Sequence, residues 1–404
     1  MKILHVMAQL PARTGSGVYY RNMIEEFKAY GHTQKALFAM QPGYGWEILG
    51  EEDSYPVHFQ TEELPFPIAG MSDVMPYEHT VYSEMTDTML DQWKAAFREK
   101  LEEIKKEYEP DLIFAHHLWI LTSMVREIFP DTKVIGICHN TDLRQARMNP
   151  SIKENHVLDL DRLDFVYAAS EEQKKEIEEV YSIPLEKQVA VGGGFNQNIF
   201  YPPSKKEYSK KIRLAYCAKI DPSKGIYELV EAYRELGLED TSLDIIGVPQ
   251  EEENRKRITK AIEGDDSIRL YNVKNQVALG DELRTKDIFL MPSYYEGLGL
   301  MAIESLACGL YVVTTEIEAL MSLLGDGIKD SGVIEYVPLP RIYDVDKPYD
   351  EDLPLFKERL KEAILRQVEK VRRQEAFPEE VAKEIKTHSW QGLVGKMNDF
   401  IESL

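Results

Sequence analysis

The sequence predicts an α/β protein built from two doubly wound domains, each with a parallel sheet covered by helices. Short apolar runs alternate with amphipathic stretches, which is typical of βα units. The alternation breaks once, at a stretch rich in Pro, Ser and Lys from Asn196 to Lys211. The chain of 404 residues is too long for one ordinary core and suits two. We therefore expect a first domain over residues 1–200 and a second over 201–385.

The first domain is expected to contain four buried strands, in the sequences KILHVMA, DLIFAHH, KVIGICHN and DFVYAAS. Between them lie stretches with helical periodicity, including Gly17 to Tyr30, Thr86 to Tyr108 and Glu171 to Tyr181. The region from Gln41 to Tyr82 is rich in Pro and Gly and fits neither period. We predict that it forms a long set of functional loops.

The second domain repeats the alternation, with strands expected in the sequences IRLAYCAK, SLDIIGV, SIRLYNV, DIFLMPS and LYVVTT. Charged helical segments follow the last strand, at Pro354 to Arg373 and Pro378 to Leu404. Two doubly wound domains imply a central cleft, with ligands at the carboxyl ends of the strands.

The composition of the chain disfavours some classes of function. The formal net charge is −22 and both halves are acidic, which disfavours binding to nucleic acid and to anionic membranes. The three cysteines show neither metal-site nor disulfide spacing, which suggests a reducing compartment. No run of 18 apolar residues and no secretory signal is recognised. We expect a cytoplasmic protein without a transmembrane segment.

Two carboxylates stand out in the apolar, glycine-rich stretch SYYEGLGLMAIESLACG. They are Glu296 and Glu304, and burying a carboxylate without a partner is costly. If the whole stretch were helical, they would lie about 12 Å apart and about 80° around the axis. Both could then contact one elongated ligand that carries hydroxyl groups. Alternatively, Glu296 caps the helix and Glu304 pairs with a lysine.

Two turns carry groups suited to phosphate. In CAKIDPSKG, Lys219 and Lys224 follow a strand and could neutralise a diphosphate, unless they are an ordinary solvated pair. In TGSGVYYRNMIEEF, Gly15 and Gly17 open a helix, where backbone amides bind anions. This second pattern could equally be a tight turn without a ligand. Because Tyr20 replaces the third glycine of the dinucleotide fingerprint, it is a weak dehydrogenase signal.

Histidines occur at two neighbouring strand ends of the first domain. His116 and His117 follow one strand and His139 follows the next, so they are candidate ligand contacts or buried structural histidines. Arg144 and Arg147 follow closely and could hold an anionic acceptor, or could be surface residues without a specific role.

Taken together, these motifs resemble the retaining, nucleotide-sugar-dependent glycosyltransferases of family four, which have the B-type fold (GT-B) of two Rossmann-like domains. The resemblance covers nearly the whole chain. Its motifs are E-x7-E at Glu296 and Glu304, a G-R-x-x-x-x-K-G-like turn at Lys219 to Gly225, the Gly-rich loop and the strand-end His139. The run AHHLWILTS resembles an H-x-H-Y-W segment in enzymes that make mycothiol precursors and sucrose phosphate. The ending HSWQGLVGKMNDFIESL resembles the family's closing helix, so we expect residues 386–404 to pack on the first domain.

The resemblance implies roles for these residues. The second domain would bind the donor, with Glu296 on the sugar, Glu304 on the ribose and both lysines on the diphosphate. The expected donor-binding residues are Lys219, Lys224, Glu296, Gly297, Leu298, Gly299, Leu300, Glu304, Gly15 and Gly17. The residues expected to act in catalysis are Glu296, His139 and Lys224. The first domain would bind the acceptor through His117, Arg144 and Arg147, and no metal ligands are expected.

Some positions depart from the family pattern. Lys219 replaces an arginine, which keeps the charge but loses bidentate phosphate binding. Gly193 and Asn196 stand where the family tends to have Asn and Asp, and Tyr311 replaces a proline. None of these changes removes a group that the reaction requires.

The resemblance implies a metal-independent, retaining transfer of a sugar from a nucleotide diphosphate sugar to a hydroxyl acceptor. No cofactor is expected beyond the donor substrate, for which a UDP-sugar is favoured. A nucleotide-sugar epimerase of the same fold and a non-catalytic nucleotide-sugar-binding subunit are the alternatives. The expected partners are the donor and a hydroxyl acceptor, without nucleic acid, and the acidity disfavours membrane association. Self-association is left open.

Overall fold

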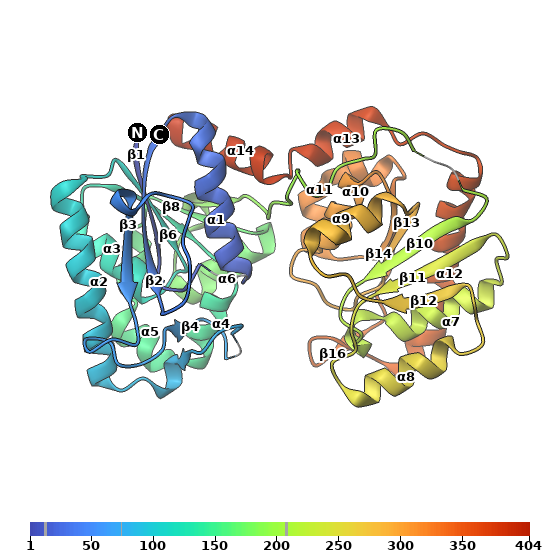
Figure 1. Ribbon diagram of the computed structural model, residues 1–404, viewed down its shortest axis with the longest axis horizontal. Helices are drawn as coiled ribbons and strands as arrows, with labels where there is room; N and C mark the ends of the chain where they lie inside the picture. Colours follow the sequence, from blue (N-terminus) through green and yellow to red (C-terminus); the bar gives the residue numbers. More distant parts are fainter. Residues whose placement is uncertain (12–13, 74, 207–208) are drawn as a thin grey trace. The chain divides into compact units, whose positions relative to one another are not determined.

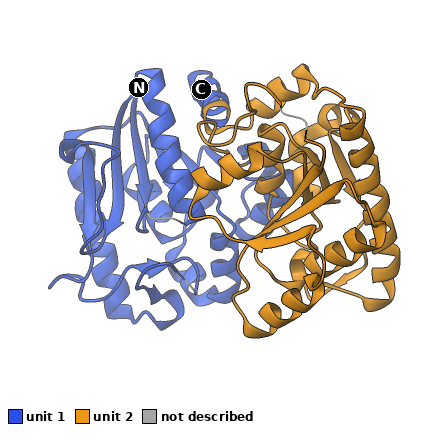
Figure 2. Cartoon of the chain, turned by 45° about the vertical axis from the view of Figure 1, so that its right-hand side comes forward, with its two compact units in different colours: residues 1–192, 393–404 blue, residues 193–392 orange. Residues whose placement is uncertain are grey.

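The structure is a computed structural model that describes residues 1–11, 14–73, 75–206 and 209–404. The chain divides into two compact units, coloured separately in Figure 2. The first comprises Met1–Gly192 with Leu393–Leu404, and the second comprises Gly193–Gly392. Each unit has its own hydrophobic core and its own large sheet. No helix in the described part of the chain is both long and apolar enough to span a bilayer.

The first unit contains a seven-stranded parallel sheet in the order β3-β2-β1-β6-β7-β8-β9. Its strands are β1 Lys2–Met7, β2 Thr33–Met40, β3 Ser54–His58, β6 Leu112–His116, β7 Lys133–Ile137, β8 Phe165–Ala168 and β9 Gln188–Ala190. Its helices are α1 Gly15–Phe27, α2 Asp87–Glu107, α3 Ile120–Ile128, α4 Thr141–Met148, α5 Pro150–His156 and α6 Glu171–Tyr181. Two short strands, β4 Ala69–Gly70 and β5 Thr80–Val81, pair separately. The strand order reverses direction between β1 and β6, the switch point at which such sheets bind ligands.

The second unit contains a six-stranded parallel sheet in the order β12-β11-β10-β13-β14-β15. Its strands are β10 Ile212–Cys217, β11 Thr241–Ile246, β12 Ile268–Tyr271, β13 Ile288–Met291, β14 Tyr311–Thr315 and β15 Ile334–Val337. Its helices are α7 Ile226–Leu236, α8 Glu252–Ile262, α9 Gln276–Arg284, α10 Leu300–Ala307, α11 Glu318–Asp330, α12 Leu353–Arg372 and α13 Glu379–Lys386. A short hairpin joins β16 Ile342–Tyr343 to β17 Lys347–Pro348. The switch point here lies between β10 and β13.

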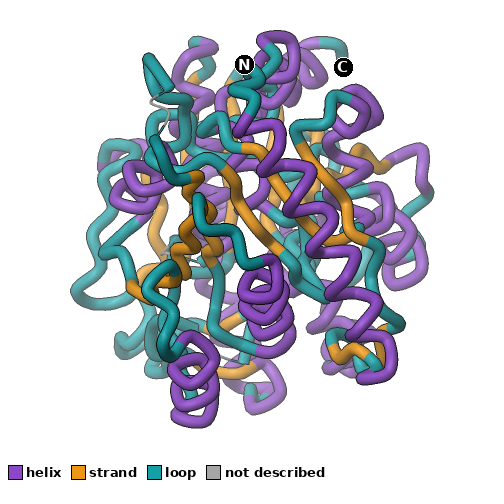
Figure 3. Tube along the Cα trace, turned by 90° about the vertical axis from the view of Figure 1, so that its right-hand side faces the viewer, coloured by secondary structure: helices purple, strands orange, loops and turns teal. Residues whose placement is uncertain are grey.

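Local sequence explains the elements. The interior of β1 is buried on both faces, as expected for a central parallel strand. Thr86 caps α2 by accepting a hydrogen bond from the amide of Met89, and the buried residues of α2 recur at helical spacing. Those buried residues are Leu90, Trp93, Phe97, Leu101 and Ile104. In both units the strands lie between helices (Figures 1 and 3).

The predicted fold class is confirmed, and all nine predicted strands are present. Four strands of the two large sheets were not predicted, namely β2, β3, β9 and β15. The hydrophobic pattern does not reveal β2 because the strand begins with polar residues. One of them, Gln34, is nevertheless buried, through hydrogen bonds to the His5 ring and to the carbonyl of Ile24. The predicted loop region 41–82 is largely irregular but contains β3.

The first predicted helix is displaced. It was expected over Gly17 to Tyr30, but α1 begins at Gly15 because the Thr14 side chain caps it, and residues 28–30 form a 3-10 turn.

The ends of the domains also differ from the prediction. The second unit begins at Gly193 and not after residue 200, because Phe195 and Phe200 are buried in its core. The predicted terminal helix over 386–404 begins later, as α14 Trp390–Glu402, after a break in which Ser389 pairs with Phe195.

Only residues 393–404 belong to the first unit. There the ring of Phe400 packs on Phe165, and Asn398 Oδ1 is 2.7 Å from His32 Nε2.

A buried ionic network ties β11 and β12 to the segment before β13. Asp244 is 1% exposed and lies 2.6 Å from the Nζ of Lys286, which is 3% exposed. Arg269 donates two further hydrogen bonds of 2.7 Å to the same carboxylate. Burial alone would raise the pKa of Asp244, but these hydrogen bonds outweigh it and hold the pKa below its ordinary value.

We predict that Asp244→Ala lowers the free energy of unfolding by about 3 kcal/mol, because it removes charge-assisted hydrogen bonds from Lys286 and Arg269 and leaves the buried Lys286 ammonium with Glu282 as its remaining described carboxylate partner. Asp240→Ala is the matched control, since Asp240 forms an exposed ion pair with Arg372, at 2.7 Å. Its expected cost is below about 1 kcal/mol. Urea unfolding measures both, and equal costs would contradict the prediction.

Candidate donor and acceptor sites

At the switch point of the second unit, the loops after β10 and β13 are in close contact. The amide of Tyr294 donates a hydrogen bond of 2.9 Å to the carbonyl of Ser223. Gly225 has a φ of +62°, and a Cβ there would lie 2.1 Å from the Pro292 carbonyl oxygen. Only glycine fits both this conformation and this space. The contact fixes Lys224, just before Gly225, beside the loop that carries Glu296.

Lys224 and Glu296 form an ion pair. The Lys224 Nζ lies 2.8 Å from Glu296 Oε1 and 3.0 Å from the Tyr295 carbonyl oxygen. The two side chains are 20% and 23% exposed, so a ligand could reach them. Glu296 therefore pairs with Lys224, a lysine of the predicted site. The alternative prediction was that Glu296 caps the following helix. Lys219, in the same loop as Lys224, is exposed.

The helix α10 begins without a side-chain cap. Its N-cap is Gly299, with a φ of +71°, so helical geometry applies only from Leu300 onward. The predicted separation of about 12 Å between the two glutamates assumed a continuous helix, and that assumption is wrong. The Ala302 amide donates a hydrogen bond of 2.9 Å to the Gly299 carbonyl, whereas the amides of Leu300 and Met301 have no hydrogen-bond partner among the described residues and are suited to bind an anion.

Glu304 is buried in α10. It is 8% exposed, and among the described residues its carboxylate has no hydrogen-bond or ion-pair partner. The predicted alternative of a pair with lysine is therefore not observed. Burial raises the pKa of Glu304 to about 8, so the free protein holds it largely protonated at neutral pH. A buried carboxyl group without a protein partner at a switch point is a candidate ligand contact.

In the first unit, the turn after β1 uses part of its predicted anion site for capping. The Thr14 hydroxyl accepts a hydrogen bond of 3.0 Å from the Gly17 amide, and the Thr14 carbonyl accepts one of 2.8 Å from the Val18 amide. Gly15 is exposed, and nothing described lies within 4 Å of the position of a Cβ. The amide of Gly17 is therefore already engaged, and Gly15 remains accessible.

The three predicted histidines lie together at the carboxyl ends of β6 and β7. His116 Nδ1 lies 3.0 Å from His139 Nε2, and the His117 ring centroid is 4.7 Å from that of His139. Burial lowers the pKa of His139 to about 3. Burial and the neighbouring histidine His139 hold the pKa values of His116 and His117 well below the ordinary range. All three rings are therefore neutral at physiological pH.

Asp142, in the first turn of α4, connects the two strand ends. Its carboxylate accepts a hydrogen bond of 2.7 Å from the Leu118 amide and one of 2.9 Å from the His139 amide. Asp142 is fully buried. Sequence reasoning did not select this residue, although an acidic residue three positions after a strand-end histidine is a recognisable signal.

The two arginines predicted to bind the acceptor are already paired. Arg144 forms an ion pair with Asp73, and Arg147 lies 2.8 Å from Glu176. Both pairs are substantially exposed, so they are weak and could rearrange. An anionic acceptor would have to compete with these carboxylates.

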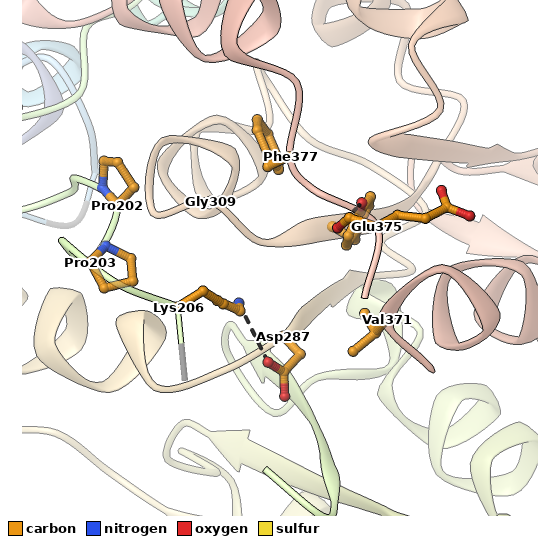
Figure 4. A pocket seen from close by; sticks show the side chains of 9 residues that line it. Pro202, Pro203, Lys206, Asp287, Gly309, Val371, Glu375 and Phe377 are labelled. Carbon is orange, nitrogen blue, oxygen red and sulfur yellow. Dashed lines mark hydrogen bonds and ion pairs between the residues drawn. The ribbon is translucent and has the colours of Figure 1, made fainter. Parts of the chain in front are cut away.

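A cavity of about 120 Å³ lies elsewhere in the second unit, where β13 and β14 begin. Figure 4 shows its polar lining, in which Lys206 pairs with Asp287 at 3.4 Å. Pro202, Phe377 and Val371 contribute apolar surface. Because β13 and β14 start here, the cavity is at the opposite end of the strands from Lys224 and Glu296, and none of the predicted site residues lines it.

Comparison with known proteins identifies two families along the chain. Residues 14–197 match the family described as Glycosyltransferase Family 4, and residues 197–338 match Glycosyl transferases group 1. A probable sucrose-phosphate synthase from Thermosipho melanesiensis is 26% identical over 176 residues, which is 40% of this chain and 42% of that protein. The N-acetyl-alpha-D-glucosaminyl L-malate synthase of Bacillus anthracis is 21% identical over 70% of this chain and 76% of its own length.

Solved structures agree on the fold. The crystal structure of Anabaena Alr3699/HepE in complex with UDP and glucose superposes with a TM-score of 0.61, covering all of both chains at 13% identity. The second family match contains Lys219, Lys224, Glu296 and Glu304, and the first contains the histidine cluster. The two family models together match residues 14–338, and the chain is a glycosyltransferase with the GT-B fold.

Proposed function

We propose that the chain is a retaining glycosyltransferase that moves a hexosyl group from a nucleotide diphosphate sugar to a hydroxyl acceptor, without a metal ion. The buried carboxyl group of Glu304 is the observation that carries the proposal. It lies without a described partner in the helix that follows the loop of the Lys224–Glu296 ion pair. A ribose supplies the two hydroxyl donors that a buried carboxylate needs.

The other residues proposed to bind the nucleotide sugar lie in the two loops that meet at this switch point and at the start of α10. Lys224 uses two of its three N–H groups on Glu296 and on the Tyr295 carbonyl, which leaves one for a phosphate oxygen. The exposed Lys219 and the amides from Gly297 to Leu300 add further phosphate contacts. Glu296 accepts hydrogen bonds from hydroxyls of the transferred sugar.

The reaction needs no strong protein base. The bond between the anomeric carbon and the diphosphate oxygen breaks, and the acceptor oxygen bonds to the same face of that carbon. The departing phosphate oxygen takes the proton of the acceptor hydroxyl. Lysine charge and backbone amides stabilise the negative charge that develops on the leaving group. With a pKa of about 3, His139 is a poor base and serves as a neutral hydrogen-bonding group.

The donor is proposed to be a UDP-sugar, since the Anabaena structure of the same fold holds UDP and glucose. The proposed acceptor is a compound that carries a hydroxyl group. The first unit would bind it through His117, with Arg144 and Arg147 available only after their ion pairs open.

A panel of nucleotide sugars tests the activity. We expect release of nucleoside diphosphate that depends on an acceptor, and NMR of the product should show a retained anomeric configuration. An isomerised nucleotide sugar formed without acceptor would indicate an epimerase instead. Calorimetric binding of a donor, without hydrolysis or transfer to any acceptor, would indicate a non-catalytic binding subunit.

Substitution of the ion pair tests the site. Glu296→Gln and Lys224→Met are each expected to lower turnover by about 100-fold, because each removes a contact to the reacting part of the donor. Lys361→Met is the matched control, because Lys361 of α12 pairs with Glu235 of α7 at 3.0 Å and neither residue belongs to the proposed site. The control should retain turnover within about twofold, since this pair only contributes to stability. Wild-type turnover in both site variants would refute the site assignment.

Glu304 should also make stability depend on pH. Its pKa is about 8 in the folded chain and about 4.5 when unfolded, so the folded state binds more protons between these values. The free energy of unfolding should therefore fall by about 1.4 kcal/mol per pH unit from this group, until pH 8.

Glu304→Gln carries no titrating group at this position. It should match the wild type near pH 4.5 and become more stable than the wild type as the pH rises to 8. Urea unfolding at several pH values measures the difference. The same variant should bind nucleoside diphosphate at least about tenfold more weakly, because it loses a charged acceptor. Parallel stability curves for the two proteins would show that Glu304 is not buried in this way.

A further inference from the structure

The ring of His139 contacts a second histidine, His116, which is not one of the motif residues on which the family resemblance rests. His116 occupies the variable position of the H-x-H-Y-W pattern and is 1% exposed. Its Nδ1 lies 3.0 Å from His139 Nε2, and the two rings lie edge to edge in nearly parallel planes, with centroids 5.2 Å apart. Since both rings are neutral, one nitrogen of this contact carries the hydrogen and the other accepts it.

The surroundings of His116 decide which nitrogen donates. The other nitrogen of His116, Nε2, is buried and has no hydrogen-bond partner among the described residues. If His139 donated, the hydrogen of His116 would have to sit on this Nε2, as a buried N–H without an acceptor. Buried N–H groups without partners are rarer than buried acceptors without partners. The favoured arrangement therefore has His116 Nδ1–H donating to His139 Nε2.

This arrangement determines which ring nitrogen of His139 is available to a ligand. A neutral imidazole carries one hydrogen, so a bare Nε2 requires that His139 Nδ1 bears it. No hydrogen bond reaches that Nδ1 from the part of the chain that the structure describes. His139 is partly exposed, unlike His116, so its Nδ1–H is the group that it offers to a ligand.

The backbone of His139 is also fixed. The His139 amide donates to Asp142 Oδ1 at 2.9 Å, and the Leu118 amide donates to Asp142 Oδ2 at 2.7 Å. The adjoining residues His117 and Asn140 have φ values of +69° and +66°, which are strained for residues with side chains. One buried carboxylate thus holds two strained strand ends in place.

We propose that His116 and Asp142 are positioning residues for His139, and that His116 fixes the tautomer in which His139 presents Nδ1–H to the substrate. The proposal rests on the proposed function for its ligand, a nucleotide sugar. It adds that the contacting substrate group must be a hydrogen-bond acceptor, such as a sugar hydroxyl oxygen. His139 then acts as a neutral donor and takes no proton during the transfer.

NMR of the free protein tests the tautomer without relying on activity. Long-range proton–nitrogen spectra of the chain labelled with ¹⁵N-histidine distinguish protonated from bare ring nitrogens. We expect His139 and His116 both to carry the hydrogen on Nδ1, with His139→Gln and His116→Asn spectra providing the assignments. A bare Nδ1 on His139 would overturn the proposal.

Variants of His116 test the role. His116→Leu removes the donor and should lower kcat/KM for the donor by about tenfold, the equivalent of one hydrogen bond. His116→Asn places an amide N–H near the position of Nδ1 and should recover most of this loss. A role in packing alone would predict the reverse order, since leucine replaces the buried ring with an apolar group. Equal activity of His116→Leu and the wild type would refute the proposal.

His5→Leu is the matched control, because His5 is also a fully buried histidine of this sheet and bonds Gln34 at 2.9 Å. It should lower stability but leave the nitrogen signals of His139 unchanged. Asp142→Asn should lower kcat/KM as well, because an amide NH₂ then faces a backbone N–H. Should that variant fail to fold, the His116 variants still decide.

The result separates the two claims. If the wild type shows the expected tautomer but transfers no sugar from any nucleotide donor, the proposed function fails and the tautomer assignment stands. If the wild type is active but the tautomer is reversed, the proposed function stands and this inference fails.

Discussion

The contact between Gly225 and the carbonyl of Pro292 determines where the charges of the second unit meet. The strand order makes β10 and β13 parallel neighbours whose next strands, β11 and β14, lie on opposite sides of them. The loops that follow β10 and β13 therefore lie side by side at the carboxyl ends of the strands. Only glycine allows those loops to approach this closely, at a left-handed backbone position. Lys224 and Glu296, which are 72 residues apart in sequence, are thereby brought to 2.8 Å. The ion pair therefore depends on the strand order and on the absence of a side chain at Gly225.

Glu296 and Glu304 show how different surroundings give two identical side chains different properties. Glu296 is partly exposed and compensated by Lys224, whereas Glu304 is buried without a described partner and its pKa rises to about 8. A ligand that donates hydroxyl groups to Glu304 would replace the proton that the free protein keeps there. Binding and deprotonation are then coupled through the same raised pKa that makes the stability of the free protein depend on pH.

The sequence was sufficient for the fold class and for nine strands, and it drew attention to polar residues that the structure places at the carboxyl ends of strands in both units. It was insufficient where a contact between distant residues decides the outcome. The strand β2 was missed because Gln34 is buried by its hydrogen bond to His5, which no hydrophobic pattern reveals. Similarly, the partner of Glu296 could not be read from the local motif, because capping and pairing fit that motif equally well. Asp142 acquires its role only when two neighbouring strands end side by side.

The switch points of the two units differ in charge, and this difference bears on the chemistry. The second unit presents lysines and carboxylates, while the first presents three neutral histidines that burial keeps from accepting protons. A mechanism with a histidine base would require a pKa near the working pH. Transfer of the acceptor proton to the departing phosphate oxygen makes no such demand. A neutral, fixed N–H donor suits that mechanism, because it orients a sugar oxygen without competing for the proton.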